Sequence, residues 1–153
     1  MKIRNPTADE LPRLSDLCFR SKAAWSYGEA FMGACRSELS FDPRDLQFTS
    51  IAVAEDDGRL IGVVQVRITE DHADLLKLFV EPDLFRRGTG RVLFNWAIET
   101  SRNVGAHRLL IDADPHAAPF YRRMGARDVG QAPSGSIPGR MLPRLTFDLA
   151  IDR

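Results

Sequence analysis

A mostly apolar run from Ala73 to Val80 restricts the fold of this chain more than any other feature. Such a run is typical of a strand that is buried on both faces in the middle of a sheet. Pro82 ends the run, because proline has no N–H to donate to a neighbouring strand. A glycine-rich turn follows, and from Gly90 to about Val104 apolar residues recur at helical spacing. The sequence therefore predicts a central strand, a glycine turn and a helix in immediate succession.

The elements before this strand are predicted from capping and turn signals. Thr7 and Glu10 form a capping box, which is typical of a helix start. Asp56-Asp57-Gly58 separates two apolar runs and predicts a hairpin turn. We expect strands at 1–4, 51–54 and 60–68, a helix from Thr7 to about Ala24, and a second helix near 28–39.

The elements after the helix complete a mixed fold. We expect a buried strand at 109–111, a short helix at 117–124, a loop at 131–143, and a last strand in which Leu145, Phe147, Leu149 and Ile151 alternate with polar residues. Hairpins joined to strand–helix–strand segments predict an α/β (α+β) fold. Its central sheet is mixed and largely antiparallel, with helices flanking it. A length of 153 residues fits one domain, residues 1–153.

Composition and charge exclude several classes of protein. The 21 basic and 21 acidic residues balance, so no broad nucleic-acid surface is expected. No segment resembles a signal peptide or a membrane span of about 20 apolar residues, which predicts a cytoplasmic protein that does not enter a membrane. Cys18 and Cys35 are expected to be small buried hydrophobic residues. The histidines and carboxylates lack metal-ligand spacing, so no metal is expected.

The glycine-rich turn is a candidate phosphate site. Gly88-Thr89-Gly90 opens a helix, where unpaired backbone N–H groups and the helix dipole favour an anion. Arg86, Arg87 and Arg91 add positive charge around it. The turn taken alone is also compatible with an ordinary strand-to-helix connection and solvated arginines. It is neither a Walker A loop nor a dinucleotide-binding fingerprint, because the lysine of the first and the third glycine of the second are absent.

Two segments together resemble a known superfamily. Leu78 to Pro82, followed by Phe85 to Arg91, resembles the acetyl-CoA-binding motif of the GNAT acetyltransferases. About 30 residues later, the segment from Asp114 to Ala126 resembles the second motif of the same superfamily. Phe85 stands where the family usually has Gln or Arg, and Asp114 where it usually has Asn. The resemblance implies a fold in which the fourth strand splays from the fifth.

The resemblance also implies how acetyl-CoA would bind as a co-substrate. Backbone groups of the central strand would pair with the pantetheine arm, amides of the glycine turn would hold the pyrophosphate, and an aromatic residue would line the channel. The implied cofactor-binding residues are Leu78, Phe79, Val80, Arg86, Arg87, Gly88, Thr89, Gly90, Arg91, Asp114 and Phe120.

Acetyl transfer needs a neutral amine, a donor to the developing oxyanion and a proton for the thiolate. The resemblance implies that Tyr121 donates that proton and that a backbone amide near Phe79 or Val80 binds the thioester oxygen. Asp74 is a candidate base, and the alternative is a solvated carboxylate. Trp25 and Tyr27 are candidate acceptor-binding residues, and the alternative is that they pack the helices onto the sheet. Arg140, in the loop near the end of the chain, is a candidate contact for an acidic group of the substrate.

The resemblance therefore implies an N-acetyltransferase that moves an acetyl group to a primary amine by direct transfer in a ternary complex. The acceptor would be a small amine or a peptide amine, with its identity open. An acyl-CoA-binding or sensor module without catalysis is the main alternative, and an ATP-dependent enzyme is a third. The last strand and its loop offer a surface for a homodimer, which the sequence does not decide.

Overall fold

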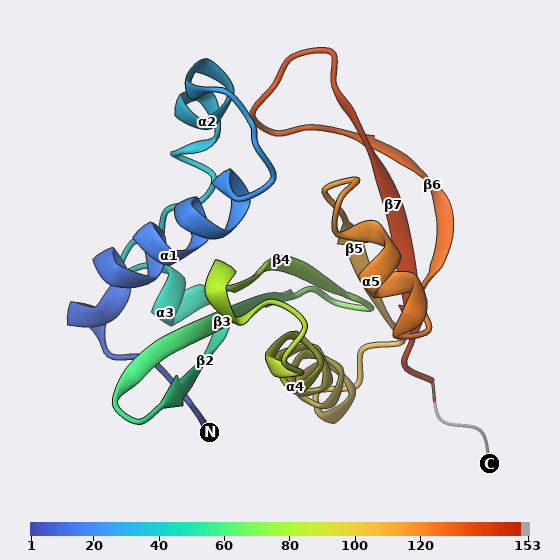
Figure 1. Ribbon diagram of the computed structural model, residues 1–153. Coiled ribbons are helices and arrows are strands. Elements are labelled where there is room, and N and C mark those ends of the chain that lie inside the picture. Colours follow the sequence, from blue (N-terminus) through green and yellow to red (C-terminus); the bar gives the residue numbers. More distant parts are fainter. Residues whose placement is uncertain (151–153) are drawn as a thin grey trace.

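Residues 1–150 are described by a computed structural model, and within them the chain forms one seven-stranded sheet (Figure 1). The strand order is β1-β2-β3-β4-β5-β7-β6, and all neighbours are antiparallel except the parallel pair β4 and β5. β4 occupies the centre, as its apolar sequence predicts. The strands are β1 (Lys2–Arg4), β2 (Ser50–Asp56), β3 (Arg59–Ile68), β4 (Ala73–Val80), β5 (Arg108–Asp112), β6 (Arg127–Pro133) and β7 (Met141–Asp148).

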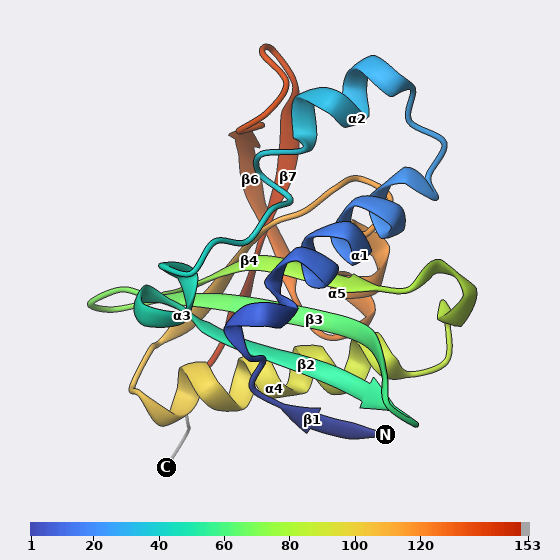
Figure 2. The ribbon, with the colours of Figure 1, turned by 90° about the vertical axis from the view of Figure 1, so that its left-hand side faces the viewer.

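Helices cover both faces of the sheet. Figure 2 shows α1 on one side of β2, β3 and β4, and α4 on the other side. Leu14 and Leu17 of α1 are buried in one apolar cluster, and Leu93 and Phe94 of α4 are buried in the other. The helical elements are η1 (Ala8–Glu10), α1 (Leu11–Ala23), α2 (Glu29–Cys35), α3 (Asp45–Phe48), η2 (Pro82–Leu84), α4 (Thr89–Asn103) and α5 (Ala118–Arg123). None of the helices within residues 1–150 is both long and apolar enough to cross a bilayer.

The sheet opens between β4 and β5. The two strands pair only from Ala73 opposite Leu109 to Leu75 opposite Ile111, and then separate. An extra residue on β4 lies at this point, because Leu75 faces Val66 of β3 while the next paired residue, Lys77, faces Gln65. Such a bulge bends a strand and increases its twist. The predicted splay of the fourth and fifth strands is therefore present, and β5, β6 and β7 turn away from β4 (Figure 1).

Most of the predicted elements are confirmed. The hairpin turn at Asp56-Asp57-Gly58 joins β2 to β3. Gly105 follows α4 with a φ of 86°, as expected for a glycine that ends a helix. The second helix is shorter than predicted, Glu29–Cys35, and α3 is an additional turn of helix.

The predicted loop at 131–143 is wrong at both ends. Residues 131–133 belong to β6, and residues 141–143 belong to β7. β6 was missed because six of its seven residues are exposed and only Ala132 is buried, so no alternation marks it. Ile151, predicted in the last strand, lies outside the described residues.

Glu10 ties the first strand to the first helix. Its buried carboxylate accepts two hydrogen bonds from the Arg4 guanidinium, at 2.9 and 2.7 Å, and one from the Thr7 N–H at 2.9 Å. The bond to Thr7 is the glutamate half of the predicted capping box. The hydrogen bonds from Arg4 lower the pKa of Glu10 from 4.5 to about 2, against the opposing effect of burial.

We predict that Glu10→Gln lowers the free energy of unfolding at pH 7 by about 2 kcal/mol, because it removes a carboxylate that accepts charged hydrogen bonds. A carboxylate with a lowered pKa stabilises the fold above its unfolded-state pKa of 4.5, and this stabilisation is lost as the pH falls through about 2. The difference between variant and wild type should therefore shrink between pH 4.5 and pH 2 in urea denaturation. Glu70→Gln, at an exposed carboxylate, is the control and should change stability by less than about 0.5 kcal/mol. A difference that does not depend on pH would contradict the assignment.

Candidate active site

One cavity of about 720 Å³ lies where the sheet opens. β4 from Leu75 to Val80 forms one wall. Another is formed around the start of α4 by Leu84, Phe85, Arg86, Gly88, Gly90 and Arg91, whereas the predicted cofactor residues Arg87 and Thr89 do not line the cavity. Residues 111–124, which include α5, lie opposite β4. The remaining lining residues come from α1 and its surroundings and from β7: Ser21, Lys22, Trp25, Glu38, Leu39 and Leu142. The cavity therefore joins both sequence motifs to the predicted acceptor side.

The glycine-rich turn presents backbone donors and positive charge to this cavity. Gly88 lies at the N-terminus of α4 with a φ of 86°, and Arg86 has a φ of 66°, which is uncommon for a residue with a side chain. The N–H groups in the first turn of α4 have no acceptor within the helix. Arg86, Arg87 and Arg91 are exposed, and none of them forms an ion pair with another described residue. The turn therefore presents groups that can bind an anion, as the predicted pyrophosphate site requires.

Gly90, in the first turn of α4, lies beside Phe120 of the second motif. A Cβ atom at this position would lie 3.5 Å from two ring carbons of Phe120, an ordinary van der Waals distance, so the position is close to the ring without requiring glycine. Phe120 is partly buried and lines the cavity beside the start of α4. The two motifs, 30 residues apart in sequence, are therefore in contact, and Phe120 lies where it can border a bound cofactor.

The unpaired edge of β4 faces the gap. Glu81 directly follows β4, and its N–H donates to Ile61 O at 2.9 Å. The backbone groups of Glu81 therefore point toward β3, and the direction at each earlier residue of β4 follows from this one. Because these groups alternate in an antiparallel pair, those of Phe79, opposite Val63, point to β3. The N–H and C=O groups of Leu78 and Val80 point the other way, into the gap. The prediction that all three backbones face a pantetheine arm is therefore corrected for Phe79, which lines the cavity but pairs with β3.

Tyr121 is one of the residues that line the cavity. It belongs to α5, is 6% exposed, and packs against Phe94 and Phe120 with ring centroids 5.5 and 5.2 Å away. Burial raises the pKa of its phenol above the ordinary value of 10. The hydroxyl therefore stays protonated across the neutral range and can donate a proton.

Asp114 joins three segments above the cavity. Its carboxylate accepts from Lys22 Nζ at 2.9 Å and from the Tyr27 hydroxyl at 2.8 Å, and Arg140 Nη2 donates to the Tyr27 oxygen at 2.8 Å. Burial alone would raise the pKa of Asp114, but these hydrogen bonds, led by that from Lys22, lower it. Burial and the neighbouring Asp114 raise the pKa of Tyr27. Asp114 lines the cavity. Tyr27 and Arg140 do not line it; they contact Asp114 and each other.

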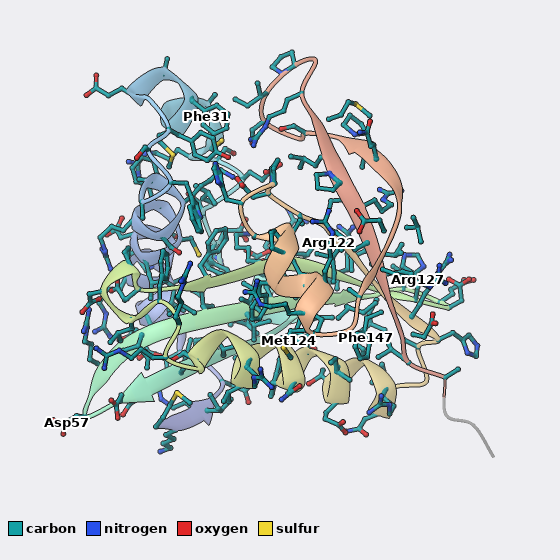
Figure 3. All side chains as sticks on the ribbon, turned by 45° about the vertical axis from the view of Figure 1, so that its right-hand side comes forward. Phe31, Asp57, Arg122, Met124, Arg127 and Phe147 are labelled. Carbon is teal, nitrogen blue, oxygen red and sulfur yellow. The ribbon has the colours of Figure 1, made fainter. Side chains whose placement is uncertain are left out.

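Aromatic rings stack at the cavity mouth. Trp25 lies parallel to His116 at 4.9 Å and near-parallel to Phe85 at 5.8 Å. This contact gives Phe85 a packing role at the position where the family usually carries Gln or Arg. Tyr27 stacks on Phe31 at 4.0 Å, and Figure 3 shows Phe31 on the side of α2 that faces the β6–β7 loop. Trp25 lines the cavity, so of the two predicted acceptor residues it is the one in direct reach.

Asp74 lies apart from the other predicted residues. It is near the start of β4, where its carboxylate contacts Arg67 at 2.9 Å and His72 Nε2 at 3.3 Å. It does not line the cavity. The base role of Asp74 stays a prediction.

Several charged residues that line the cavity were missed in the sequence, among them Glu38, Asp112 and Arg123. Lys77 and Lys22 both line the cavity. A lysine within the apolar central strand was the available signal for Lys77, whereas nothing local marks Lys22. Within residues 1–150, no group of three or more His, Cys, Asp or Glu side chains is arranged to hold a metal ion.

The comparisons with known proteins agree with this geometry. The Acetyltransferase (GNAT) family matches residues 11–126, and the chain therefore belongs to this family of acetyl-CoA-dependent acyltransferases. No curated protein matches this sequence.

Solved structures share the fold across nearly the whole chain. PaiA N-acetyltransferase from Thermoplasma acidophilum, solved with coenzyme A, has a TM-score of 0.78 and 18% identity, covering 96% of this chain and 98% of its own. A GCN5-related N-acetyltransferase from Rhodopseudomonas palustris has a TM-score of 0.78 and 22% identity, and the match covers 97% of this chain and 95% of the other. An aminoglycoside 6'-N-acetyltransferase, solved with coenzyme A, has a TM-score of 0.76 and 16% identity, and the match covers 100% of this chain and 99% of the other.

We predict that Gly88→Ala weakens coenzyme A binding about tenfold or more, measured by calorimetric titration. A Cβ at a φ of 86° meets no neighbour within 4 Å, so the cost is conformational, about 1–2 kcal/mol. Relief of that strain would turn the backbone donors away from the phosphates, and each charged hydrogen bond contributes about 1.5–3 kcal/mol.

Gly28→Ala is the matched control for this variant. Gly28 has a φ of −72° and open space around it, so binding should stay near wild type. Wild-type affinity in Gly88→Ala would show that the turn does not depend on the left-handed glycine.

Proposed function

We propose that this protein is an N-acetyltransferase that moves the acetyl group of acetyl-CoA directly to a primary amine in a ternary complex. The observation that carries the proposal is the single cavity that joins the glycine turn, the open edge of β4 and Tyr121. Solved relatives of the same fold act on amines, among them the ribosomal-protein-S18-alanine N-acetyltransferase from Escherichia coli and the aminoglycoside 6'-N-acetyltransferase.

Bound acetyl-CoA would supply an activated acetyl group as a thioester. The first-turn amides of α4 and the nearby arginines fit its pyrophosphate, and the backbones of Leu78 and Val80 fit its pantetheine arm. A backbone N–H of β4 can also hold the thioester oxygen without moving, because β3 fixes the strand. Tyr121 can deliver its hydroxyl proton to the departing sulfur, and the proton that the amine nitrogen loses as the amide forms restores the tyrosine hydroxyl.

Direct transfer is supported by the state of the two cysteines. Cys18 is completely buried, and burial raises the pKa of its thiol to about 12. Cys35 is 3% exposed, and neither cysteine lines the cavity. Neither thiol is therefore placed to carry the acetyl group between donor and acceptor.

The acceptor amine must lose a proton before it attacks. The predicted base Asp74 does not line the cavity, so it is not positioned to take this proton from an amine bound there. An amine can instead enter as its minor neutral population, in which case the rate rises with pH until the amine is deprotonated.

We predict that Tyr121→Phe lowers kcat about 10²-fold or more, the usual contribution of a positioned acid. The dissociation constant of coenzyme A should stay near wild type, because the ring still packs between Phe94 and Phe120. Release of CoA thiol in an amine screen measures the first quantity, and calorimetry measures the second.

Two other results would contradict parts of the proposal. Unchanged turnover in Tyr121→Phe would remove the hydroxyl from the mechanism. Tight binding of acetyl-CoA by the wild type, with no CoA release for any amine class, would favour the alternative of an acyl-CoA-binding module.

A further inference from the structure

Lys77 places a positive charge in the part of the cavity that the cofactor-binding residues do not use. It lies next to the bulge of β4, directly opposite Gln65 of β3, on the sheet face covered by α1. Residues that are paired in this way share one face of the sheet. Ser21 and Leu39 line the cavity on the same side, so this region lies between α1, the segment after α2 and β4.

The ammonium group of Lys77 has only neutral contacts. Nζ donates to Gln65 Oε1 at 3.0 Å and lies 4.7 Å from the centre of the Phe41 ring. Among the described residues, no carboxylate lies within the 4.0 Å of an ion pair. An ammonium has three donors, and only one has a protein acceptor here.

The lack of an anionic partner destabilises the charged form of Lys77, because its side chain is half-buried. Burial lowers the pKa of Lys77, and the distant carboxylates of Asp45, Glu38 and Asp42 oppose this effect only in part. A cation in such a place is usually paired with an anion or hydrogen-bonded on all sides.

The other two cations on this side already have partners. Lys22 is bonded to Asp114, and Arg140 donates to Tyr27 and lies 3.7 Å from Asp114. Glu38 lines the cavity beside Gly135 of the β6–β7 loop and forms no ion pair with another described residue, so it is a further negative charge near Lys77. Among the described residues, the other cations that line the cavity without an anionic partner are exposed, whereas Lys77 is half-buried.

We propose that Lys77 binds a carboxylate of the acceptor, so that the substrate class is amines that also carry a carboxylate. This inference rests on the proposed function and narrows it. The amine would lie at the β4 gap and the carboxylate at Lys77, on the α1 face of the same strand. Leu39, which lines the cavity, supplies apolar surface for a carbon chain on this side.

A length series of acceptors tests this assignment. The ω-amino acids from glycine to 6-aminohexanoate are compared with their amides, which keep the size but lack the charge. We expect kcat/KM of the wild type to favour the carboxylate at one chain length by about tenfold or more, the effect of one charged hydrogen bond. Lys77→Met should abolish the preference, and Lys77→Arg should retain part of it. Lys2→Met, at an exposed lysine of β1, should leave it unchanged.

Binding without turnover separates this inference from the proposed function. The N-acetylated ω-amino acids and their amides are titrated calorimetrically into the complex with CoA, in wild type and in Lys77→Met. Carboxylate binding that depends on Lys77 supports the inference, even if no amine is acetylated. The absence of acetylation would contradict only the proposed function. Equal binding of acid and amide to the wild type, or a preference that survives in Lys77→Met, would overturn the assignment of the carboxylate to Lys77.

Discussion

The separation of β4 from β5 is the constraint on which the site depends. A parallel pair that continued to the ends of both strands would satisfy the backbone groups of Leu78 and Val80 and fill the gap. The pairing stops instead after Leu75 and Ile111, where the extra residue of β4 bends the strand. The fold therefore leaves polar backbone groups unpaired at its centre, and a bound chain with amide groups can satisfy them.

The opening is held by contacts between segments that are distant in sequence. Asp114 receives hydrogen bonds from Lys22 and Tyr27, and Arg140 reaches Tyr27 from the β6–β7 loop. These bonds connect α1, the loop before α5 and the β6–β7 loop across the cavity. A carboxylate at position 114 can bind two cations and a hydroxyl at once, which an asparagine in the same place would do more weakly. The family's usual Asn is thus replaced by a residue that fits the neighbours in this chain.

Sequence patterns predicted the centre of the fold better than its edge. The apolar run of β4, the turn at Gly88 and the capping signals of Glu10 and Gly105 each follow from local chemistry and are present. β6 could not be predicted, because its residues are exposed and its pairing with β7 is a tertiary contact. For the same reason, the sequence could not show that Phe79 pairs with β3, that Asp74 lies outside the cavity, or that Phe85 stacks on Trp25.

Hydrogen exchange of backbone amides along β4, followed by NMR with and without coenzyme A, tests the central claim most directly. Phe79 bonds to β3, so its amide should exchange slowly in both states. The amides of Leu78 and Val80 should exchange faster in the free protein and become protected when coenzyme A binds. Saturation with coenzyme A that leaves both of these amides unchanged would contradict the claim that the open edge of β4 receives the cofactor.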